Sequence, residues 1–222
     1  MFESEMMISR IRNSGIYFFK KIGLQPERSC EYDFAFKCIP NNADTILDVG
    51  STGSLFPLKL AKAGFKVHVI DSRKYPEKHK NLEITMGDIT NNNFSDNYFD
   101  IISCVSTIEH IGLSAYGDPK FNNGDFNAFN EFKRIVKKKG FLIITTPFSK
   151  KYCLKSLGET VERIYNWDRL KKLFEGWDII REEYYIPIGK FNWKRTERLE
   201  AEKVYKQYER SNLSCYLLKK NN

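Results

Sequence analysis

Carboxylates, glycines and a histidine follow four short apolar segments of the chain, and side chains of these types bind and activate ligands. Asp48 and Gly50 end the segment "TILDVG", Asp71 ends "FKVHVID", and Asp88 comes just after "LEITMG". His110, one of only three histidines, lies a few residues beyond "YFDIISCVS". If the four segments are neighbouring parallel strands, these residues gather at the carboxyl edge of one sheet, where open α/β sheets bind their ligands.

The segment "DVGSTGS" (48–54) has the composition of a ligand-binding loop. Gly50 and Gly53 allow unusual backbone dihedral angles, and N–H groups ahead of a helix donate hydrogen bonds to a ligand. Asp71, at the second strand tip, can accept the hydroxyls of an adenosine ribose, and Asp88 can meet an adenine amino group or a loop amide. Simpler roles stay open: Asp48 can tie down the loop, Asp71 can cap a helix after the second strand, and Asp88 can cap the next turn.

Other nucleotide sites fit the sequence poorly. A nicotinamide-binding G-x-G-x-x-G loop aligned at Gly50 needs glycine at Thr52 and Leu55, and neither is glycine. Tyr116 and Lys120 have the spacing of the Tyr-x-x-x-Lys pair that short-chain dehydrogenases carry on a helix. The intervening "GDP" contains a glycine and a proline, which oppose a helix. A phosphate-binding G-x-x-x-x-G-K-[ST] loop does not occur.

The elements that must position these residues alternate between strands and helices. Two helices are predicted with caps: one begins at Ser54 and ends at Gly64, and the other begins at Asp125 and ends at Gly140. Two more are predicted in "NWDRLKKLFEG" (166–176) and in the basic segment 190–210. Residues 1–40 are expected to form a helical cap over the sheet or the site. Strands that alternate with helices predict a parallel sheet covered on both faces, and the two late strands of the chain suit an antiparallel edge.

The sequence resembles the class I S-adenosylmethionine-dependent methyltransferases. The resemblance rests, in order, on "ILDVGSTGS", "VHVID", "MGDI", "FDIISCVSTIEHI", "FKRIVKKKGFLIITTP" and "SCYLLKK", and it covers roughly residues 44–218. It implies a Rossmann-like three-layer α/β sandwich with a seven-stranded, mostly parallel sheet whose last strand is antiparallel. We therefore expect one methyltransferase domain over residues 1–222, with an N-terminal cap (1–40) and a Rossmann-like core (44–218).

The resemblance also implies a cofactor, S-adenosyl-L-methionine, and the residues that bind it. The resemblance assigns the methionine part to Asp48, Gly50, Ser51 and Gly53. It assigns the ribose to Asp71 with Ser72, the adenine to Asp88 with Ile89, and the sulfonium to Ser106 and Thr107. The family loop is usually D-x-G-x-G-x-G, whereas this chain has Thr52 and Ser54 in place of the second and third glycines. Both replacements are small, so we expect the cofactor to bind with altered loop contacts.

The segment after the fourth strand is predicted to carry the chemistry. Because a hydroxyl acceptor must lose a proton as it attacks, we nominate His110 as the base, with Glu109 as its orienter or as a ligand of the acceptor. A histidine that only packs or caps locally is the alternative. The residues "EHIGL-x-x-YGDP" (109–119), which run into the long loop 112–124, resemble a methyltransferase subgroup associated with surface-sugar or lipid synthesis. Asp118 and Asp125 have no histidine or cysteine nearby, so we expect no metal.

The composition limits which cellular compartment and which kinds of partner we expect for the protein. The chain has 222 residues, a formal charge of +8, and five widely spaced cysteines, with neither an apolar segment long enough to cross a bilayer nor a signal-peptide core. These features predict a cytoplasmic enzyme with reduced thiols. The expected function is O-methylation of a small-molecule, saccharide or lipid-linked acceptor. The alternatives are an RNA methyltransferase that uses the basic segment 194–210, and a noncatalytic interaction protein that keeps only the cofactor fold.

Overall fold

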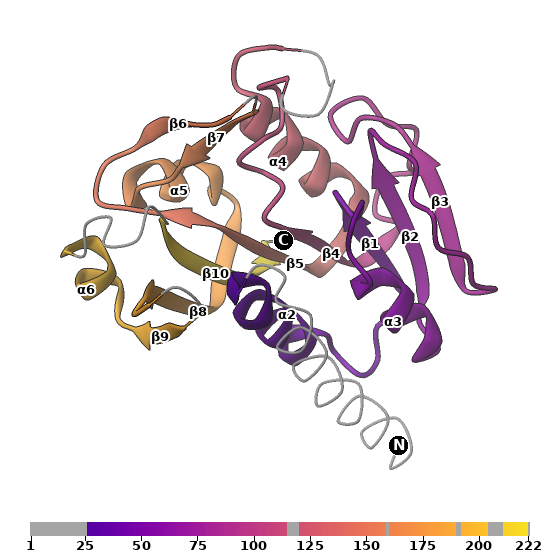
Figure 1. The fold of residues 1–222 in the computed structure, drawn as a ribbon. Helices are drawn as coiled ribbons and strands as arrows, with labels where there is room; N and C mark the ends of the chain where they lie inside the picture. The colour runs from indigo at the N-terminus through magenta and orange to yellow at the C-terminus, as the bar shows by residue number, and fades with distance from the viewer. Residues whose placement is uncertain (1–25, 115–119, 159, 190–191, 204–210, 222) are drawn as a thin grey trace.

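The structure is a computed structural model that describes residues 26–114, 120–158, 160–189, 192–203 and 211–221. Within these ranges it contains one eight-stranded sheet and one separate two-stranded hairpin. Figure 1 shows the sheet running through the middle of the molecule. In spatial order its strands are β3 (Leu82–Met86), β2 (Lys66–Asp71), β1 (Thr45–Val49), β4 (Phe99–Val105), β5 (Val136–Phe148), β10 (Asn212–Lys220), β8 (Trp177–Pro187) and β9 (Trp193–Thr196).

Most of the sheet is parallel, with β1 between β2 and β4 and with β4 parallel to β5. The last strand, β10, runs antiparallel to both β5 and β8, as predicted. The prediction of seven strands was wrong by one, because β9 adds a short antiparallel edge to β8. The Rossmann-like fold class is confirmed, and the chain order reverses between β1 and β4, which creates the crevice where such sheets bind ligands.

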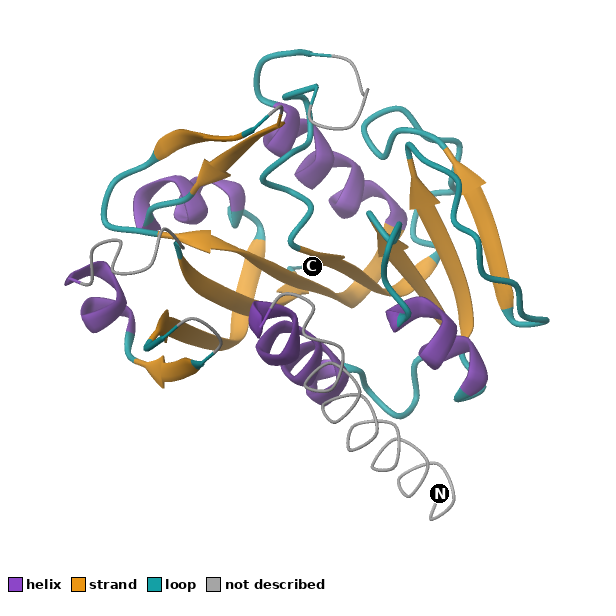
Figure 2. Cartoon of the chain, in the orientation of Figure 1, coloured by secondary structure: helices purple, strands orange, loops and turns teal. Residues whose placement is uncertain are grey.

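Helices cover both faces of the sheet (Figure 2). On one face lie α2 (Pro26–Cys38) and α3 (Phe56–Lys62), whose buried side chains share one apolar core. On the other lie α4 (Gly124–Ile135) and α5 (Trp167–Leu173), which form a second core with side chains of β4, β5 and β10. The predicted three layers are therefore present, with a separate apolar core on each side of the sheet.

Two of the predicted helix starts differ in detail. For α3, the Ser54 hydroxyl accepts a hydrogen bond from the backbone N–H of Phe56 (3.0 Å), although the residue just before the helix is Leu55. For α4, Asp125 is not the cap: the helix begins at Gly124, and Asp125 is buried in a bidentate pair with Arg169, at 2.9 Å to each nitrogen. This helix also ends earlier than predicted, because the chain joins β5 directly after it.

The basic segment 190–210 is not one helix. Its described part forms the edge strand β9 and then the short helix α6 (Arg198–Lys203), whereas residues 190–191 and 204–210 lie outside the described residues. The N-terminal cap is represented by α2, and residues 1–25 lie outside the described part of the chain. Among the described residues, no helix combines the length and the apolar character needed to cross a membrane.

A hairpin between β5 and α5 was not predicted. Strands β6 (Cys153–Leu157) and β7 (Thr160–Ile164) pair antiparallel with each other and leave the sheet at the carboxyl end of β5. The hairpin returns beside β5, where the N–H of Ser149 donates to the carbonyl of Tyr165 (2.8 Å). It therefore lies next to the end of the sheet at which the predicted site residues gather.

Candidate active site

A cavity of about 370 Å³ opens at the carboxyl ends of β1 to β4, within the size range of small-molecule sites. Residues from four strand tips and from α2 line it. The predicted residues in its lining are Gly50, Gly53, Asp71, Ser72, Asp88, Ile89, Ser106, Thr107 and His110. Three predicted residues, Asp48, Ser51 and Glu109, are buried behind the lining instead. The three strand tips that carry Gly50, Asp71 and Asp88 therefore share one cavity.

The loop after β1 depends on glycine geometry. Gly50 has a φ of +77° and Gly53 a φ of +86°, both in the left-handed region that glycine adopts at little cost. The N–H of Gly50 donates to the carbonyl of Ile70 (2.9 Å), which ties the loop to β2. Thr52 and Ser54, which replace the expected second and third glycines, both line the cavity. The altered loop therefore still forms part of the cavity wall.

Asp48 supports this loop from beneath. Its carboxylate accepts hydrogen bonds from the hydroxyls of Ser51 and Ser103, both of which are buried. The contact with Ser51 ties down the loop, which is the simpler role that the sequence left open for Asp48. Burial is the main cause that raises the Asp48 pKa to about 6, and hydrogen bonds from the two serines only partly offset it. Asp48 is thus a structural partner of the loop rather than a residue exposed to the ligand.

Asp71 joins the tips of β1 and β2. One carboxylate oxygen accepts from the N–H of Thr52 (2.8 Å), and the other accepts from the N–H of Arg73 (2.8 Å). Residues 72–81, all of them described, contain no helix, so Asp71 does not cap one. The Oδ1 atom also accepts from the Arg73 guanidinium (3.4 Å). The Oδ2 atom has a second lone pair, and the residue lines the cavity, so Asp71 can still accept a ligand hydroxyl.

Asp88 and Ile89 sit in the turn after β3. The Asp88 carboxylate accepts from the N–H of Thr90 (2.8 Å), which makes it a turn cap as well as part of the cavity wall. The side-chain amide of Asn92 donates to the carbonyl of Ile89 (2.7 Å) and to the carboxylate of Glu131 on α4 (2.8 Å). The position of this turn is therefore fixed from α4.

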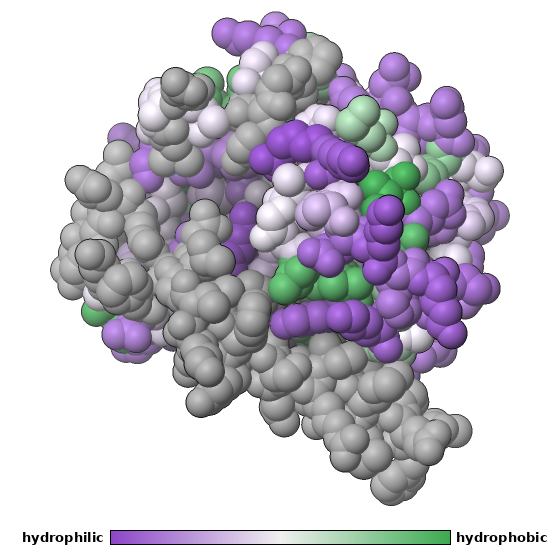
Figure 3. Space-filling view, turned by 45° about the vertical axis from the view of Figure 1, so that its right-hand side comes forward, coloured by the Kyte–Doolittle hydropathy of each residue, from purple (hydrophilic) through white to green (hydrophobic). Residues whose placement is uncertain are grey.

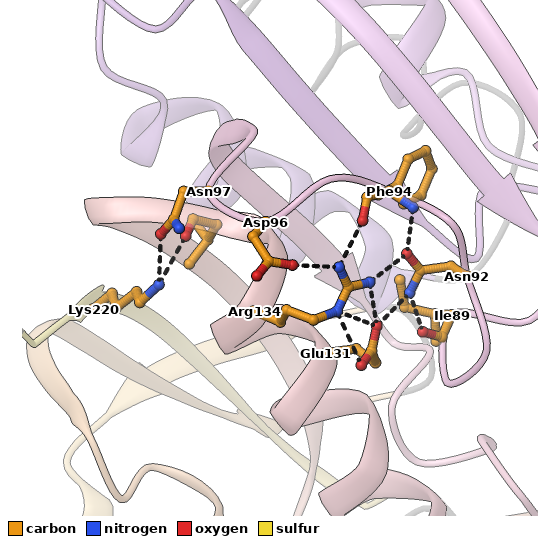
Figure 4. Close-up of polar contacts among 9 residues, drawn as sticks. Ile89, Asn92, Phe94, Asp96, Asn97, Glu131, Arg134 and Lys220 are labelled. Atoms are coloured by element: carbon orange, nitrogen blue, oxygen red, sulfur yellow. Dashed lines mark hydrogen bonds and ion pairs between the residues drawn. The ribbon is translucent and has the colours of Figure 1, made fainter.

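Arg134, also on α4, completes this anchor (Figure 4). Its guanidinium donates to the backbone carbonyl of Phe94 (2.6 Å), to Asp96 (2.8 Å) and to the side-chain oxygen of Asn92 (3.1 Å). It also pairs with Glu131 (2.7 Å). Arg134 thus contacts the connection between β3 and β4 at three positions, and Asn92 links this anchor to Ile89 in the cavity lining.

His110 lines the cavity and is oriented by the hairpin. Its Nδ1 atom lies 3.0 Å from the carbonyl oxygen of Val161 on β7. A neutral ring with this contact carries its hydrogen on Nδ1, which leaves Nε2 as the basic nitrogen. The backbone of Val161 therefore occupies the nitrogen that an orienting carboxylate was expected to hold.

Glu109 does not face the cavity. Its side chain is 1% exposed, and its Oε2 atom has no hydrogen-bond partner among the described residues. Burial raises the pKa of this carboxyl well above its usual value. The Glu109 backbone carbonyl, in contrast, accepts from the N–H of Arg163 (3.0 Å) on the hairpin. Through its backbone carbonyl, Glu109 therefore helps to hold the segment after β4 in place.

Two residues of the cavity wall come from α2 and were missed in the sequence. Arg28 and Tyr32 line the cavity, and the Tyr32 hydroxyl donates to the Ser54 hydroxyl (2.8 Å) in the loop after β1. A single arginine and tyrosine on a polar helix give no pattern that distinguishes a cavity wall from an exposed face. Residues 115–119, which include the predicted "YGDP" segment, lie outside the described residues.

Comparison with solved structures finds the same fold at low sequence identity. The 1,6-didemethyltoxoflavin-N1-methyltransferase of Burkholderia thailandensis, solved with 1,6-didemethyltoxoflavin and S-adenosylhomocysteine bound, superposes with a TM-score of 0.63. It shares 12% identity, over 99% of this chain and 87% of its own. A SAM-dependent methyltransferase from Methanosarcina mazei gives a TM-score of 0.60 and 13% identity, over 84% and 96% of the two chains.

A third solved structure with this fold is named for different chemistry. The [4+2]-cyclase SpnF superposes with a TM-score of 0.53 and 13% identity, over 80% of this chain and 74% of its own. The neighbours together identify the fold as that of class I S-adenosylmethionine-dependent methyltransferases. Because the same fold carries a cyclase, the reaction has to be argued from the site.

At the level of sequence, a search of curated proteins gives no match. A family model does match residues 62–213, which is well over half of the chain. The matched region begins at the end of α3 and runs into β10, so it contains the second, third and fourth strand tips of the cavity. The chain therefore belongs to the family described as "Caenorhabditis protein of unknown function, DUF268".

Proposed function

We propose that this protein is an S-adenosyl-L-methionine-dependent methyltransferase that methylates an oxygen atom of a small-molecule, saccharide or lipid-linked acceptor. The observation that carries the proposal is the shared cavity of Gly50, Asp71 and Asp88 at the point where the strand order reverses. Three separate strand tips contribute the backbone and carboxylate groups that an adenosyl ligand requires. Their convergence is a stronger argument than any one of the motifs.

The residues present fit this cofactor. Gly50 and its neighbours offer a close approach to the methionine part, Asp71 offers acceptors for the ribose hydroxyls, and Asp88 lies where the adenine would end. Arg28 provides a guanidinium in the cavity wall, which suits the carboxylate of the methionine part. When bound, the cofactor supplies an electrophilic methyl group on a sulfonium.

His110 is the residue best placed to take a proton from the acceptor. It lines the same cavity as Thr107, and a neutral ring that donates from Nδ1 carries its basic lone pair on Nε2. General-base catalysis of this kind contributes about 10²–10⁴-fold to a rate. Alignment of the acceptor and exclusion of water would supply the remaining rate enhancement, because methyl transfer is an in-line displacement.

The acceptor class rests on the resemblance of the "EHIGL" and "YGDP" residues to sugar- and lipid-associated methyltransferases. No observation on the described residues specifically favours either alternative, the RNA methyltransferase or the noncatalytic interaction protein. The RNA methyltransferase was argued from a continuous basic helix, which the structure divides into β9 and α6. For an interaction module we would expect a broad apolar surface. On the face seen in Figure 3, the described residues are mainly hydrophilic, with small separate hydrophobic groups.

Calorimetry tests the proposal directly. We expect saturable binding of S-adenosylmethionine and S-adenosylhomocysteine with one site per chain, and much weaker binding of NAD. Asp71→Ala serves as the matched variant, because it removes the expected ribose acceptor from the cavity wall. A tight complex with NAD, together with no heat from either S-adenosyl compound, would end the proposal.

A further inference from the structure

Glu31 is a fully buried carboxylate on α2, beside the cavity but not in its lining. Its Oε1 atom accepts hydrogen bonds from the hydroxyls of Ser106 and Thr145, the latter at 2.7 Å. Its Oε2 atom accepts from the guanidinium of Arg28 (3.2 Å). A buried carboxylate is costly unless its oxygens are satisfied, so these contacts from α2, β5 and the end of β4 are what permit Glu31 in the core.

Ser106, one partner of Glu31, has an unfavourable backbone conformation. Its φ is +42°, in the left-handed region that residues with a Cβ rarely adopt. Such residues persist only where their surroundings hold them in place. The N–H of Ser106 donates to the backbone oxygen (3.2 Å) and to the hydroxyl (3.0 Å) of Thr145, and the Ser106 hydroxyl donates to Glu31. Glu31 and Thr145 therefore hold this conformation together.

The turn at Ser106 decides where the next residues go. Ser106 follows β4 directly, and Thr107 and His110, which come after it, both line the cavity. The N–H of His110 donates to the carbonyl of Thr107 (3.0 Å), so residues 107–110 form one turn. A change in the backbone at Ser106 would displace the whole acceptor side of the cavity.

We infer that Glu31 is a positioning residue: it stabilises the left-handed turn at Ser106 and thereby places Thr107 and His110 in the cavity. The side chain belongs to α2, which also supplies Arg28 and Tyr32 to the wall, so docking of this helix assembles the site. The inference rests on the proposed function only because binding of an S-adenosyl compound reports the cavity geometry.

The test is a comparison of S-adenosylhomocysteine affinity among three proteins by calorimetry: the wild type, Glu31→Gln, and Glu31→Gln combined with Ser106→Gly. Glutamine leaves Arg28 without its carboxylate and offers one acceptor in place of two, so we expect binding about 10-fold weaker. Glycine adopts a φ of +42° freely and needs no anchor. The double variant should therefore regain at least about threefold over Glu31→Gln.

Glu183→Gln is the matched control. Glu183 is also a buried carboxylate that pairs with an arginine, Arg181 (2.9 Å), and accepts from a hydroxyl, that of Tyr185, but it lies outside the cavity lining. This variant should lose stability and keep its affinity for S-adenosylhomocysteine. An equal loss of affinity in Glu183→Gln and Glu31→Gln would show a general structural effect and overturn the inference.

The remaining outcomes are also decisive. Wild-type affinity in Glu31→Gln, or no gain from adding Ser106→Gly, would refute the positioning role. Absence of binding by the wild-type protein would refute the proposed function instead. Should Glu31→Gln fail to fold, Ser106→Ala and Ser106→Gly decide the question, because both lose the hydroxyl and only alanine keeps the backbone strain. We then expect tighter binding by the glycine variant, and equal affinities would refute the inference.

Discussion

Thr107 lies directly against the α-carbon of Gly50. A Cβ atom placed on Gly50 would come within 2.2 Å of the Thr107 Oγ1 atom and within 2.3 Å of its Cγ2 atom. The Thr107 hydroxyl is itself fixed by donating to the carbonyl of Val105 (3.0 Å). The turn after β4 therefore rests on the loop after β1, and the methionine and acceptor sides of the proposed site are in direct contact.

Gly50→Ala is expected to weaken S-adenosylhomocysteine binding more than Gly53→Ala. Both positions have positive φ, which costs about 1 kcal/mol or more for alanine. Only Gly50 also lacks room, because a Cβ on Gly53 meets nothing within 4 Å. We expect a loss of at least about 10-fold for Gly50→Ala, measured by calorimetry. Equal effects of the two substitutions would show that contact with Thr107 is unimportant.

Asp48 should make stability fall as the pH rises. Its pKa is raised, chiefly by burial, to about 6 from 3.8, with Asp71 adding to the shift, so the folded protein holds this proton more tightly than the unfolded chain. Its contribution to the free energy of unfolding therefore declines between pH 4 and 6. Asp48→Asn removes the titration, so the variant should gain about 2 kcal/mol on the wild type between pH 4.5 and 7 in urea unfolding. A constant difference would contradict the buried assignment.

Arg28→Gln should reduce affinity for ligands that carry the methionine carboxylate. We expect binding of S-adenosylhomocysteine to fall about 10-fold, the typical loss of a charge-assisted hydrogen bond. Methylthioadenosine lacks the amino-acid part, so its affinity should change far less. If both ligands lose affinity equally, Arg28 supports the fold of the cavity and does not contact the carboxylate.

His110→Ala should lower methyl transfer far more than it lowers cofactor affinity. Loss of a general base reduces turnover by about 10²–10⁴-fold. The measurement is the transfer of labelled methyl groups to a panel of saccharide and lipid-linked acceptors, with S-adenosylhomocysteine affinity measured in parallel. A variant with wild-type turnover on an accepted substrate would exclude His110 as the base.

Arg134→Ala should loosen the connection between β3 and β4. Arg134 is partly exposed and donates hydrogen bonds to two carboxylates, a backbone carbonyl and an amide oxygen, so we expect a loss of about 2 kcal/mol in the free energy of unfolding. Amide hydrogen exchange of residues 88–97 should accelerate selectively. Arg134→Lys keeps the charge without the planar donor set, and it should restore only part of this protection.

The sequence was a good guide to the inner strands of the sheet, because β1, β2, β4, β5 and β10 carry apolar segments that are largely buried. It also predicted which residues end those strands, and hence which side chains meet in the cavity. It failed at β9, where "WKRT" lies at an exposed edge and its charged residues resemble a helix surface. Edge strands with one solvated side carry little apolar pattern, so local sequence alone does not reveal them.

The contribution of α2 could not be predicted for a related reason. Arg28 and Glu31 are three residues apart, a spacing typical of exposed helical ion pairs, yet Glu31 is fully buried. Only the tertiary fold brings Ser106 and Thr145 to it, across 75 and 114 positions of the chain. Similarly, Glu109 beside His110 suggested a catalytic pair, but the two side chains point to different environments.

The hairpin β6–β7 reaches the site through the backbone carbonyl of Val161, which contacts His110, and through Arg163. The backbone N–H of Arg163 donates to the Glu109 carbonyl, and its guanidinium donates to the carbonyls of Glu109 (3.3 Å) and Ile111 (2.8 Å). Backbone contacts persist when side chains are exchanged. Substitution of an exposed hairpin residue such as Leu154 would therefore leave the backbone contact to His110 in place. On the proposed function, side chains of the hairpin could thus change beside the cavity while the backbone contact to His110 stays in place.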